Sequence, residues 1–383
     1  MLASDTGIAI LGAGIFAKEG HLPALQKLGP LAPKLKAVYS RSEKSARELA
    51  AEATVLLNTA PDVYFDDNPS LNLDALLARS DISSVIIILP ITLQPSVVLK
   101  ALAAGKHVLS EKPVSADVAS GVGLIAQYEA QYKPKGLVWR VAENWEVEPG
   151  HIAARRAIAG GKIGKVTFFS SRAVNFTDRG TKWYTSAWRL FPEHQGGFVL
   201  DTGVHSAAAL RVILPSAMTH LSGFASLNKQ ILAPHDTINT IIKNADGSHG
   251  IFELSFAAPS LSRCDLERGI IITGTDGWLK VQQTMVRDLI RNVEEPGFRV
   301  TIKSATRGAN GVLGPEKEEV IDEPFRGVEL EQASFFVALA GKDDGLGSPL
   351  GALKDVAVLE AALTSGGELV DLEKLISQSI WDM

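Results

Sequence analysis

The chain has 383 residues, of which 46% are hydrophobic and 21% are charged. That composition is typical of a globular protein with apolar material for about two domains. The formal net charge of −5 argues against a nucleic-acid-binding surface. The longest apolar runs, such as Val85–Leu89, are far too short to span a membrane. A single cysteine, Cys264, excludes an internal disulfide and a cysteine-rich metal site.

The compartment follows from the start of the chain. A strand-like run begins by Gly7, with Asp5 just before it, so no secretory signal peptide fits in front of it. Together with the near absence of cysteine, this favours a reduced compartment. We therefore expect a cytoplasmic protein.

The first third of the chain alternates short β-rich runs with helical patterns. The predicted strands are Ile8–Leu11, Leu35–Tyr39, Val85–Leu89, His107–Leu109 and Leu137–Val141, and the predicted helices between them are Phe16–Leu28, Glu43–Ala53, Leu93–Ala104 and Val118–Tyr132. Such alternation predicts parallel βαβ units with right-handed crossovers. We assign them to a first domain, residues 1–143.

The pattern changes near Asn144, where we place the start of a second domain, residues 144–383. After a helix at His151–Ala159, the predicted strands are Val166–Val174, His220–Leu227, Thr237–Lys243, Gly250–Phe256, Gly269–Thr273 and Trp278–Val281. A series of strands without intervening helices predicts a large, mostly antiparallel sheet. Gly308–Glu319 is expected to be a surface loop, and two helices, Val328–Ala340 and Ala352–Ser365, are expected near the end.

The first predicted strand runs directly into GAGIFA, residues Gly12–Ala17. Two glycines allow a tight turn and a close backbone approach, and the free N–H groups at the following helix start favour a pyrophosphate. The G-x-G-x-x-A pattern is weak alone, but here it lies between a strand and a helix, the context it requires. It indicates dinucleotide binding rather than a merely tight turn.

The end of the second predicted strand bears on the choice between NAD and NADP. NAD-binding domains usually carry an acidic residue there, whereas this chain has Ser40, Arg41 and Ser42, with Lys44 close by. Two hydroxyls and a guanidinium suit a 2′-phosphate, because arginine presents paired planar donors to phosphate oxygens. We therefore predict NADP(H), against the alternative of a solvated loop.

The stretch GGFVLDTGVH, Gly196–His205, places Asp201 and His205 four residues apart, on one face of a helix. The pair could be metal ligands, part of a nucleophilic triad, a proton-transfer pair or a satisfied polar pair in a core. No two of the eight histidines lie within one helical turn, which weakens the metal hypothesis. The chain has no G-x-S-x-G elbow for a serine nucleophile.

Four motifs in this order carry a resemblance to a known family. They are the glycine turn at Gly12–Ala17, AGKHVLSEKP at Ala104–Pro113, GKIGKV at Gly161–Val166 and the aspartate–histidine stretch at Gly196–His205. The sequence resembles the Gfo/Idh/MocA oxidoreductases, named for glucose–fructose oxidoreductase and inositol dehydrogenase. The motifs span nearly the whole chain, and the tail around Phe335–Ser365 also fits.

The resemblance implies an α/β fold with a Rossmann domain and a second α/β domain whose large open-faced sheet commonly forms oligomers. A homodimer or homotetramer through that sheet is therefore expected. It also implies that Lys112, Asp201 and His205 are catalytic, and that the Lys112–Pro113 peptide is strained or cis. With these roles, His205 would transfer a proton, Asp201 would orient it or hold a substrate hydroxyl, and Lys112 would stabilise a developing oxyanion.

The candidate binding residues fall into two sets. Those expected to bind the dinucleotide are Gly12, Gly14, Ile15, Phe16, Ser40, Arg41, Ser42, Lys44, Leu89, Pro90, Glu111 and Lys112. Those expected to bind substrate are Asn144, Trp145, Trp183, Tyr184, Trp188, Arg189, Asp201 and His205. Aromatic faces with interleaved hydrogen-bonding groups suit a sugar or polyol, although an aromatic loop packed on a sheet is the alternative for Trp183–Arg189. No metal is expected.

Three positions depart from the family pattern. Gln94 and Ala208 replace a common histidine and aspartate, and Glu146 replaces an arginine found in many members, while Asn144 and Pro149 still match. These changes bear on substrate identity rather than on the reaction type. We expect an NADP(H)-dependent oxidoreductase that acts on a hydroxyl or keto carbon of a sugar, inositol or polyol. The alternatives are a dinucleotide-binding sensor without turnover and a nicotinamide-dependent glycoside hydrolase.

Overall fold

The computed structural model describes residues 6–190, 192, 194–264, 266, 268–288, 292–309 and 311–381. The chain divides into two compact units. The first unit holds the chain up to Asn144 together with Gly327–Leu353, and the second holds Trp145–Arg326 and the chain from Lys354 onward. Both units combine helices with a sheet, which confirms the expected α/β class.

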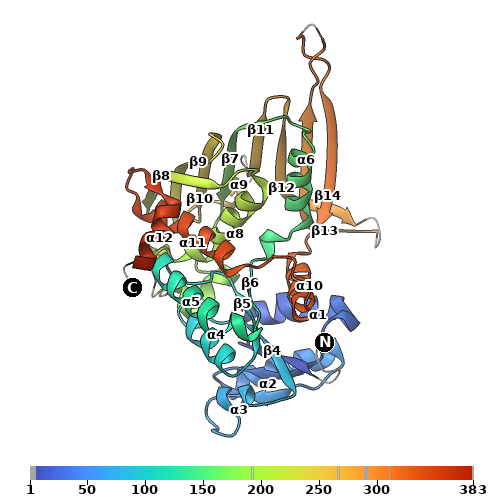
Figure 1. Ribbon diagram of the computed structural model, residues 1–383, viewed down its shortest axis with the longest axis vertical. Helices are drawn as coiled ribbons and strands as arrows, with labels where there is room; N and C mark the ends of the chain where they lie inside the picture. The colour runs from blue at the N-terminus through green and yellow to red at the C-terminus, as the bar shows by residue number, and fades with distance from the viewer. Residues whose placement is uncertain are drawn as a thin grey trace. The chain divides into compact units, whose positions relative to one another are not determined.

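The first unit is built on a six-stranded parallel sheet in the order β3-β2-β1-β4-β5-β6 (Figure 1). The strands are β1 (Gly7–Leu11), β2 (Leu35–Tyr39), β3 (Asp62–Tyr64), β4 (Ile82–Ile87), β5 (His107–Glu111) and β6 (Trp139–Ala142). The helices between them are α1 (Leu22–Leu28), α2 (Glu43–Leu57), α3 (Leu73–Leu77), α4 (Gln94–Ala103) and α5 (Val118–Gln131). This strand order is that of the Rossmann fold, in which ligands bind where the order reverses, here between β1 and β4.

The central strands are buried on both faces, which explains their continuous apolar sequence. All five residues of β1 are buried, and Ile8 and Ile10 pack in one core with Leu25 of α1 and Leu49 of α2. The start of α2 is fixed by Ser42, whose side chain accepts a hydrogen bond from the Ser45 N–H as an N-cap.

The domain boundaries 1–143 and 144–383 expected from the sequence differ from these units, because α10 (Gly327–Leu339) and the segment after it belong to the first unit. Phe335 is fully buried in the core that contains β1. The N–H of Val141 in β6 donates to the carbonyl of Gly347 at 2.8 Å. The returning segment therefore completes the unit beside its edge strand, and strand alternation alone gives no sign of it.

The second unit is built on a nine-stranded sheet in the order β14-β13-β12-β11-β7-β10-β9-β8-β15. The strands are β7 (Val166–Val174), β8 (Met218–Ser226), β9 (Thr237–Asn244), β10 (His249–Ser255), β11 (Gly269–Gly274), β12 (Gly277–Asp288), β13 (Val293–Ser304), β14 (Lys317–Pro324) and β15 (Val370–Asp371). The sheet is mostly antiparallel, as expected, with β7 and β10 paired in parallel.

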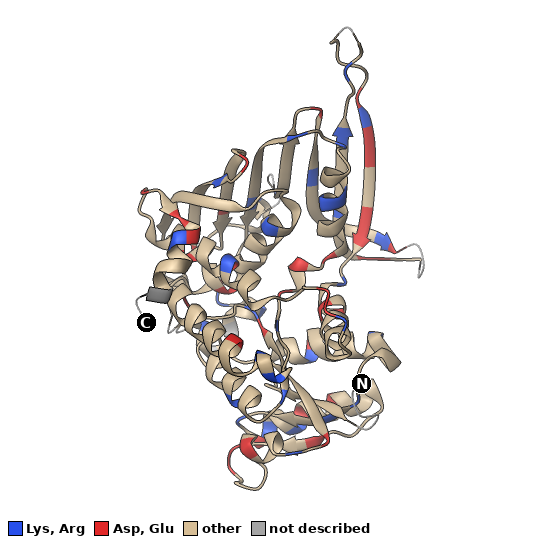
Figure 2. Ribbon diagram, in the orientation of Figure 1, with Lys and Arg blue, Asp and Glu red and all other residues tan. Residues whose placement is uncertain are grey.

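One face of this sheet is covered by helices. The helices of the unit are α6 (Pro149–Ala159), α7 (Ala187–Leu190), α8 (Phe198–Ile213), α9 (Leu261–Cys264), α12 (Leu372–Trp381) and the greater part of α11 (Pro349–Thr364). Of these, α8 contacts β7 and β10, and α6 contacts β12 and β13 (Figure 1). Lysines and arginines are interspersed with acidic residues over the chain, as Figure 2 shows. On β13 and β14 they form cross-strand pairs such as Arg299–Asp322.

Some elements differ from the sequence predictions. The expected loop Gly308–Glu319 is partly strand, since β14 begins at Lys317. Lys303 of β13 pairs with Glu318 across the two strands, which extends the sheet into this segment. The short β3, α3 and β15 were not predicted, because two to five residues give little periodic signal. The last helix, α12, was missed although Leu372, Leu375 and Ile376 recur at helical spacing. Among the described helices, none is long and apolar enough to cross a membrane.

Candidate functional site

The turn after β1 requires glycine at its first position. Gly12 has a φ of +116°, and a Cβ atom there would lie 2.0 Å from the carbonyl oxygen of Ile88. Its own N–H donates to the carbonyl of Tyr39 at 2.8 Å. The chain after β1 therefore passes tightly between the ends of β2 and β4, with the Leu89 side chain beside it. Any larger residue would push the turn away from the edge where the strand order reverses.

Gly14 serves a different purpose in the same turn. It is exposed, its φ lies outside the left-handed region, and a Cβ built on it meets nothing within 4 Å. Helical turns begin at the next residue, Ile15, and continue through Phe16. N–H groups at a helix start can donate hydrogen bonds to a pyrophosphate, and a glycine with no atoms near it lets the pyrophosphate approach closely. The turn thus fits the dinucleotide that the sequence predicts.

The end of β2 holds the residues on which the NADP prediction rests. Arg41 and Lys44 are exposed, Ser40 is half-buried and Ser42 is occupied as the N-cap of α2. An acid that sequence analysis missed lies here too, since the Tyr39 hydroxyl donates to Asp66 at 2.7 Å. Burial, and then that hydrogen bond, raises the pKa of Tyr39 well above its usual value. Asp66 follows β3, which was itself not predicted.

The predicted lysine stands at the carboxyl end of β5. Glu111 is the last residue of that strand and is buried, whereas Lys112 is half-buried. The Lys112–Pro113 peptide is cis, as the resemblance implied. Gln94, the first residue of α4, donates from Nε2 to the carbonyl of Glu111 at 3.1 Å. This departure from the family pattern therefore supports the backbone immediately before Lys112.

In the second unit, Asp201 and His205 both lie on α8, four residues apart and so on one face. Asp201 is 4% exposed, and its Oδ2 accepts a hydrogen bond from Arg189 Nε at 2.7 Å. The Arg189 guanidinium in turn lies 4.1 Å from the ring centre of Trp188 and 5.4 Å from that of Trp183. The structure thus brings four predicted substrate residues, Trp183, Trp188, Arg189 and Asp201, into one cluster.

The imidazole of His205 is stacked on the indole of Trp145, with ring centres 5.5 Å apart and planes 24° from parallel. Trp145 is itself held in place, because its carbonyl is 2.8 Å from His151 Nδ1 and its ring meets Phe298 edge-on. A flat neighbour of this kind restricts the orientation of the imidazole. Trp145 therefore contacts the expected proton-transfer group directly.

Glu146 takes part in a buried ion network that the sequence did not reveal. Arg211 of α8 binds Asp355 through two contacts of 2.8 Å and reaches Glu146 at 3.3 Å. Burial lowers the pKa of Arg211, but the charge and hydrogen bonds of Asp355, with help from Glu146, raise it overall. Glu146 thus connects the 3₁₀ turn Asn144–Glu146 to the helix that carries Asp201 and His205. The partners are 65 and 144 residues away from Arg211, so no local pattern could indicate them.

The remaining aromatic candidates are less enclosed. Trp183 is 41% exposed, whereas Tyr184 stacks on Phe198 at the start of α8 with ring centres 6.4 Å apart. The Tyr184 contact resembles structural packing, while the Trp183 ring keeps an accessible surface. Ala208, three residues after His205 and in place of a common aspartate, is fully buried in α8.

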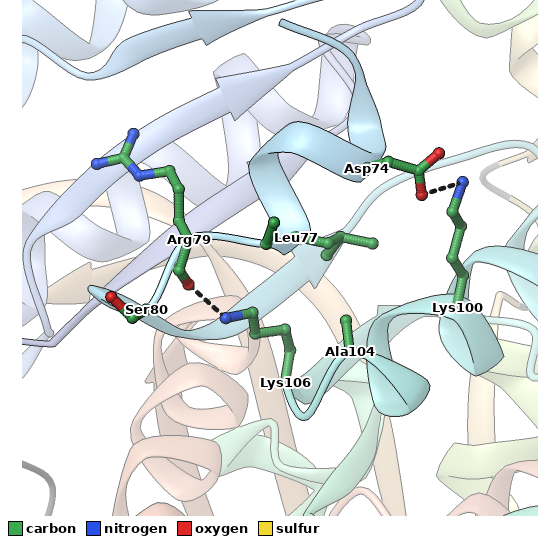
Figure 3. Close-up of a pocket in the computed structure, with 8 residues that line it drawn as sticks. Asp74, Leu77, Arg79, Ser80, Lys100, Ala104 and Lys106 are labelled. Carbon is green, nitrogen blue, oxygen red and sulfur yellow. Dashed lines mark hydrogen bonds and ion pairs between the residues drawn. The ribbon is translucent and has the colours of Figure 1, made fainter. Parts of the chain in front are cut away.

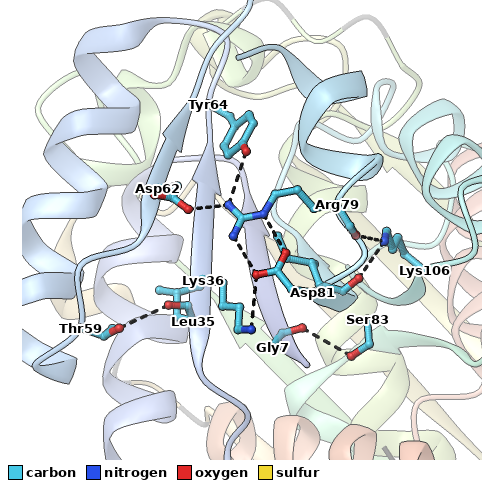
Figure 4. A network of polar contacts seen from close by, with 11 residues as sticks. Gly7, Leu35, Lys36, Thr59, Asp62, Tyr64, Arg79, Asp81, Ser83 and Lys106 are labelled. Carbon is cyan, nitrogen blue, oxygen red and sulfur yellow. Dashed lines mark hydrogen bonds and ion pairs between the residues drawn. The ribbon is translucent and has the colours of Figure 1, made fainter. Parts of the chain in front are cut away.

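A hollow of about 430 Å³ lies elsewhere in the first unit, lined by Asp74, Leu77, Ala78, Arg79, Ser80, Lys100, Ala104 and Lys106 (Figure 3). Its residues precede β4 and β5, at the amino ends of the strands, whereas ligands of such sheets bind at the carboxyl ends. Figure 4 shows that Arg79 is held by Asp62 and Asp81. Lys106, whose pKa burial lowers, donates to the carbonyls of Arg79 and Ile82. These contacts hold the segments before β4 and β5 together, which indicates a structural role rather than a ligand-binding site.

Comparison with known proteins agrees with this geometry. Residues 6–134 match the model of the NAD-binding Rossmann fold of the Gfo/Idh/MocA oxidoreductase family, and residues 155–368 match its C-terminal α/β domain. The dehydrogenase FPY6 of Fusarium mangiferae is 38% identical, covering 94% of this chain and 96% of that protein. The chain belongs to the Gfo/Idh/MocA oxidoreductase family, and its first domain is of the NAD-binding type.

Two further relatives are informative. A 1,5-anhydro-D-fructose reductase of Ensifer adhaerens is 28% identical, covering 80% of this chain and 82% of that protein. A crystal structure of an oxidoreductase from Thermotoga maritima superposes with a TM-score of 0.78 at 28% identity, covering 97% of this chain and 99% of that one.

The two glycines of the turn give a matched test. Gly12→Ala should lower the free energy of unfolding by about 1–3 kcal/mol, because alanine is strained at its φ. For a domain of this size, each kcal/mol lost lowers Tm by roughly 2–4 °C. Gly14→Ala should leave Tm unchanged but weaken dinucleotide binding ~10-fold, which corresponds to ~1.4 kcal/mol. Thermal melts and fluorescence titrations measure both. Unchanged dinucleotide binding by Gly14→Ala would show that the turn is not the phosphate site.

Proposed function

We propose that this protein is an NADP(H)-dependent oxidoreductase that acts on a hydroxyl or keto carbon of a sugar, inositol or related polyol. The observation that carries the proposal is the pair Asp201 and His205 on one face of α8, with Trp145 stacked on the imidazole. The 1,5-anhydro-D-fructose reductase among its relatives supports a sugar ketone as the substrate class. The accessible Trp183 ring beside Arg189 suits a ligand with apolar C–H faces and a polar rim.

In this proposal the bound nicotinamide supplies or accepts the hydride at the substrate carbon. His205 gives a proton to the substrate oxygen during reduction and takes it back during oxidation, a task for which imidazole is suited near neutral pH. To the ammonium of Lys112 we assign the stabilisation of the negative charge that develops on a substrate oxygen during reduction. Asp201 holds a neighbouring hydroxyl, and Arg189 keeps that carboxylate in a single orientation.

Substitution of the two proton- and charge-handling groups tests these roles. Lys112→Met should lower kcat by ~10²–10³, the effect of losing one oxyanion donor. His205→Ala should lower it by ~10²–10⁴, the range of general acid–base catalysis. Both variants should bind NADPH nearly as the wild type does. The measurement is nicotinamide absorbance with a panel of sugars, inososes and small ketones, supplied with NADPH or NADP⁺.

The control is Lys27→Met, an exposed position on α1 that should leave turnover unchanged. Wild-type rates in either catalytic variant would contradict its assigned role. A glycoside hydrolase would cleave substrate without net change in nicotinamide absorbance, and a sensor would bind the dinucleotide without turnover.

The preference for NADP(H) rests on Arg41. If its exposed guanidinium holds the 2′-phosphate, Arg41→Ala removes a charge-assisted contact of ~1.5–3 kcal/mol. NADPH binding should then weaken roughly 10- to 150-fold, while NADH binding should hardly change. Arg47→Ala, an exposed arginine on α2, is the control. Equal losses for both cofactors would mean that Arg41 only stacks on the adenine, and a wild-type preference for NADH would overturn the assignment, with Asp66 then the candidate ribose acceptor.

We also infer a homodimer or homotetramer formed through the sheet of the second unit. The pairing register places Phe168, Phe224, Ile241, Ile251 and Val320 on one face of that sheet. Each of these side chains is between 47% and 66% exposed in the single chain. An apolar surface of this kind is a liability unless another protein surface covers it.

Light scattering at micromolar concentration tests the oligomer. The wild type should have the mass of two or four chains, and Ile241→Asp should reduce it, because a charge in the covered face is costly to desolvate. Val55→Asp, which alters an 87% exposed apolar residue on α2, should leave the mass unchanged. A wild-type protein that is strictly monomeric would rule out the sheet interface.

A further inference from the structure

The buried Glu111 carboxylate makes contacts in two directions. Its Oε1 is 2.8 Å from His21 Nε2, and its Oε2 accepts a hydrogen bond from the backbone N–H of Lys112 at 3.2 Å. His21 is fully buried and Glu111 is 7% exposed. A single side chain therefore connects a histidine 90 residues earlier in the chain to the backbone of the predicted catalytic lysine.

The other nitrogen of His21 fixes the direction of this contact. Gln332 of α10 places its Nε2 2.9 Å from His21 Nδ1 and 3.3 Å from the carbonyl of His21. A carbonyl only accepts, so the amide donates, and Nδ1 is then the acceptor. The proton of a neutral imidazole consequently lies on Nε2, from which His21 donates to Glu111.

Glu111 depends on that donor for a physical reason. A carboxylate oxygen of Glu331, on α10, lies within 4.8 Å of the Glu111 and His21 atoms, and Glu331 is also buried. Two carboxylates close together in a dry site disfavour each other's charge. Hydrogen bonds from His21 and from the Lys112 N–H offset that repulsion at Glu111. Removing His21 should therefore release the Glu111 side chain from its present orientation.

The other end of the chain of contacts is the dinucleotide turn. The Phe16 ring, two residues after Gly14, meets His21 edge-on with ring centres 5.3 Å apart. Between them the helix widens into a π-helical turn, Ala17–His21, an irregularity found frequently at functional sites. A ligand that fixes the position of Phe16 therefore restricts the position of His21. Through the Glu111 side chain it then restricts the backbone of Lys112.

We propose that His21 and Glu111 are positioning residues that couple dinucleotide binding at Gly12–Phe16 to the placement of Lys112. The coupling depends on the proposed function in one respect, which is that Lys112 acts on the substrate. Ordering of the Lys112 backbone by the dinucleotide is a separate, measurable property of the first unit.

Hydrogen exchange followed by mass spectrometry measures that ordering without turnover. In the wild type, NADP⁺ or NAD⁺ should slow exchange in peptides that cover Ser110–Val114. In His21→Leu, which removes the donor, exchange there should rise ~10-fold or more, as expected for the loss of a charge-assisted hydrogen bond. The same segment should then hardly respond to the dinucleotide. His21→Gln, whose amide reaches a similar position, should restore part of both effects.

A matched control separates positioning from loss of stability. Leu28→Ala removes a buried side chain from the core of the same unit without touching Glu111. It should raise exchange throughout the unit rather than at Ser110–Val114 alone. A uniform rise in His21→Leu, or a dinucleotide response equal to that of the wild type, would overturn the proposal. The proposal would also be overturned if Zn²⁺, but not the dinucleotide, slowed exchange at Ser110–Val114. His21, Glu111 and Glu331 would then form a metal site.

The kinetic arm distinguishes this proposal from the proposed function. Where a substrate is found, His21→Leu should lower kcat with little change in KM, and it should have no further effect in a Lys112→Met background. Additive losses would show that His21 does not act through Lys112. If no substrate is turned over, the proposed function fails while the exchange experiment still decides the coupling.

Discussion

Buried carboxylates need hydrogen-bond donors or cations held at fixed positions, and the candidate site residues are arranged around this constraint. Glu111 is bound by His21, Asp201 by Arg189, and Asp355 with Glu146 by Arg211. Burying an unpaired charge costs several kcal/mol, so each carboxylate fixes the element that supplies its partner. In the first unit that element is the helix entered from the glycine turn, and in the second it is the aromatic segment before α8 and α8 itself.

This arrangement gives the candidate site residues little freedom to reorient. His205 lies against Trp145, whose position follows from His151 and Phe298. Arg211 ties the turn before α6 to the helix of His205. Preorganised groups of this kind are what stabilises charge in a transition state, because the protein need not rearrange as the charge develops. The departures Gln94 and Glu146 belong to supporting contacts of the same kind, with the carbonyl of Glu111 and with Arg211.

Much of the fold could be predicted, because long periodic elements carry strong signals. The strand–helix alternation predicted five of the six strands of the parallel sheet, and the strand run after residue 166 predicted the mostly antiparallel one. The glycine turn was predictable because its motif is local, and the structure supplies the reason for glycine at position 12: a φ of +116° and a carbonyl oxygen 2.0 Å from where a Cβ would lie. The return of α10 to the first unit was not, since Phe335 packs with β1 residues more than 300 positions earlier.

For the site, the sequence by itself determined which residue types stand at the turn, at the end of β5 and on α8, because those motifs are local. Spacing alone placed Asp201 and His205 on one helical face. Only the tertiary structure decided the partners of these residues: Gln94 and His21 for Glu111, Arg189 for Asp201, Trp145 for His205, and Asp355 for Arg211. The physical reason is that contacts between residues far apart in the chain form only when the chain packs, and they leave no periodicity or spacing in the sequence.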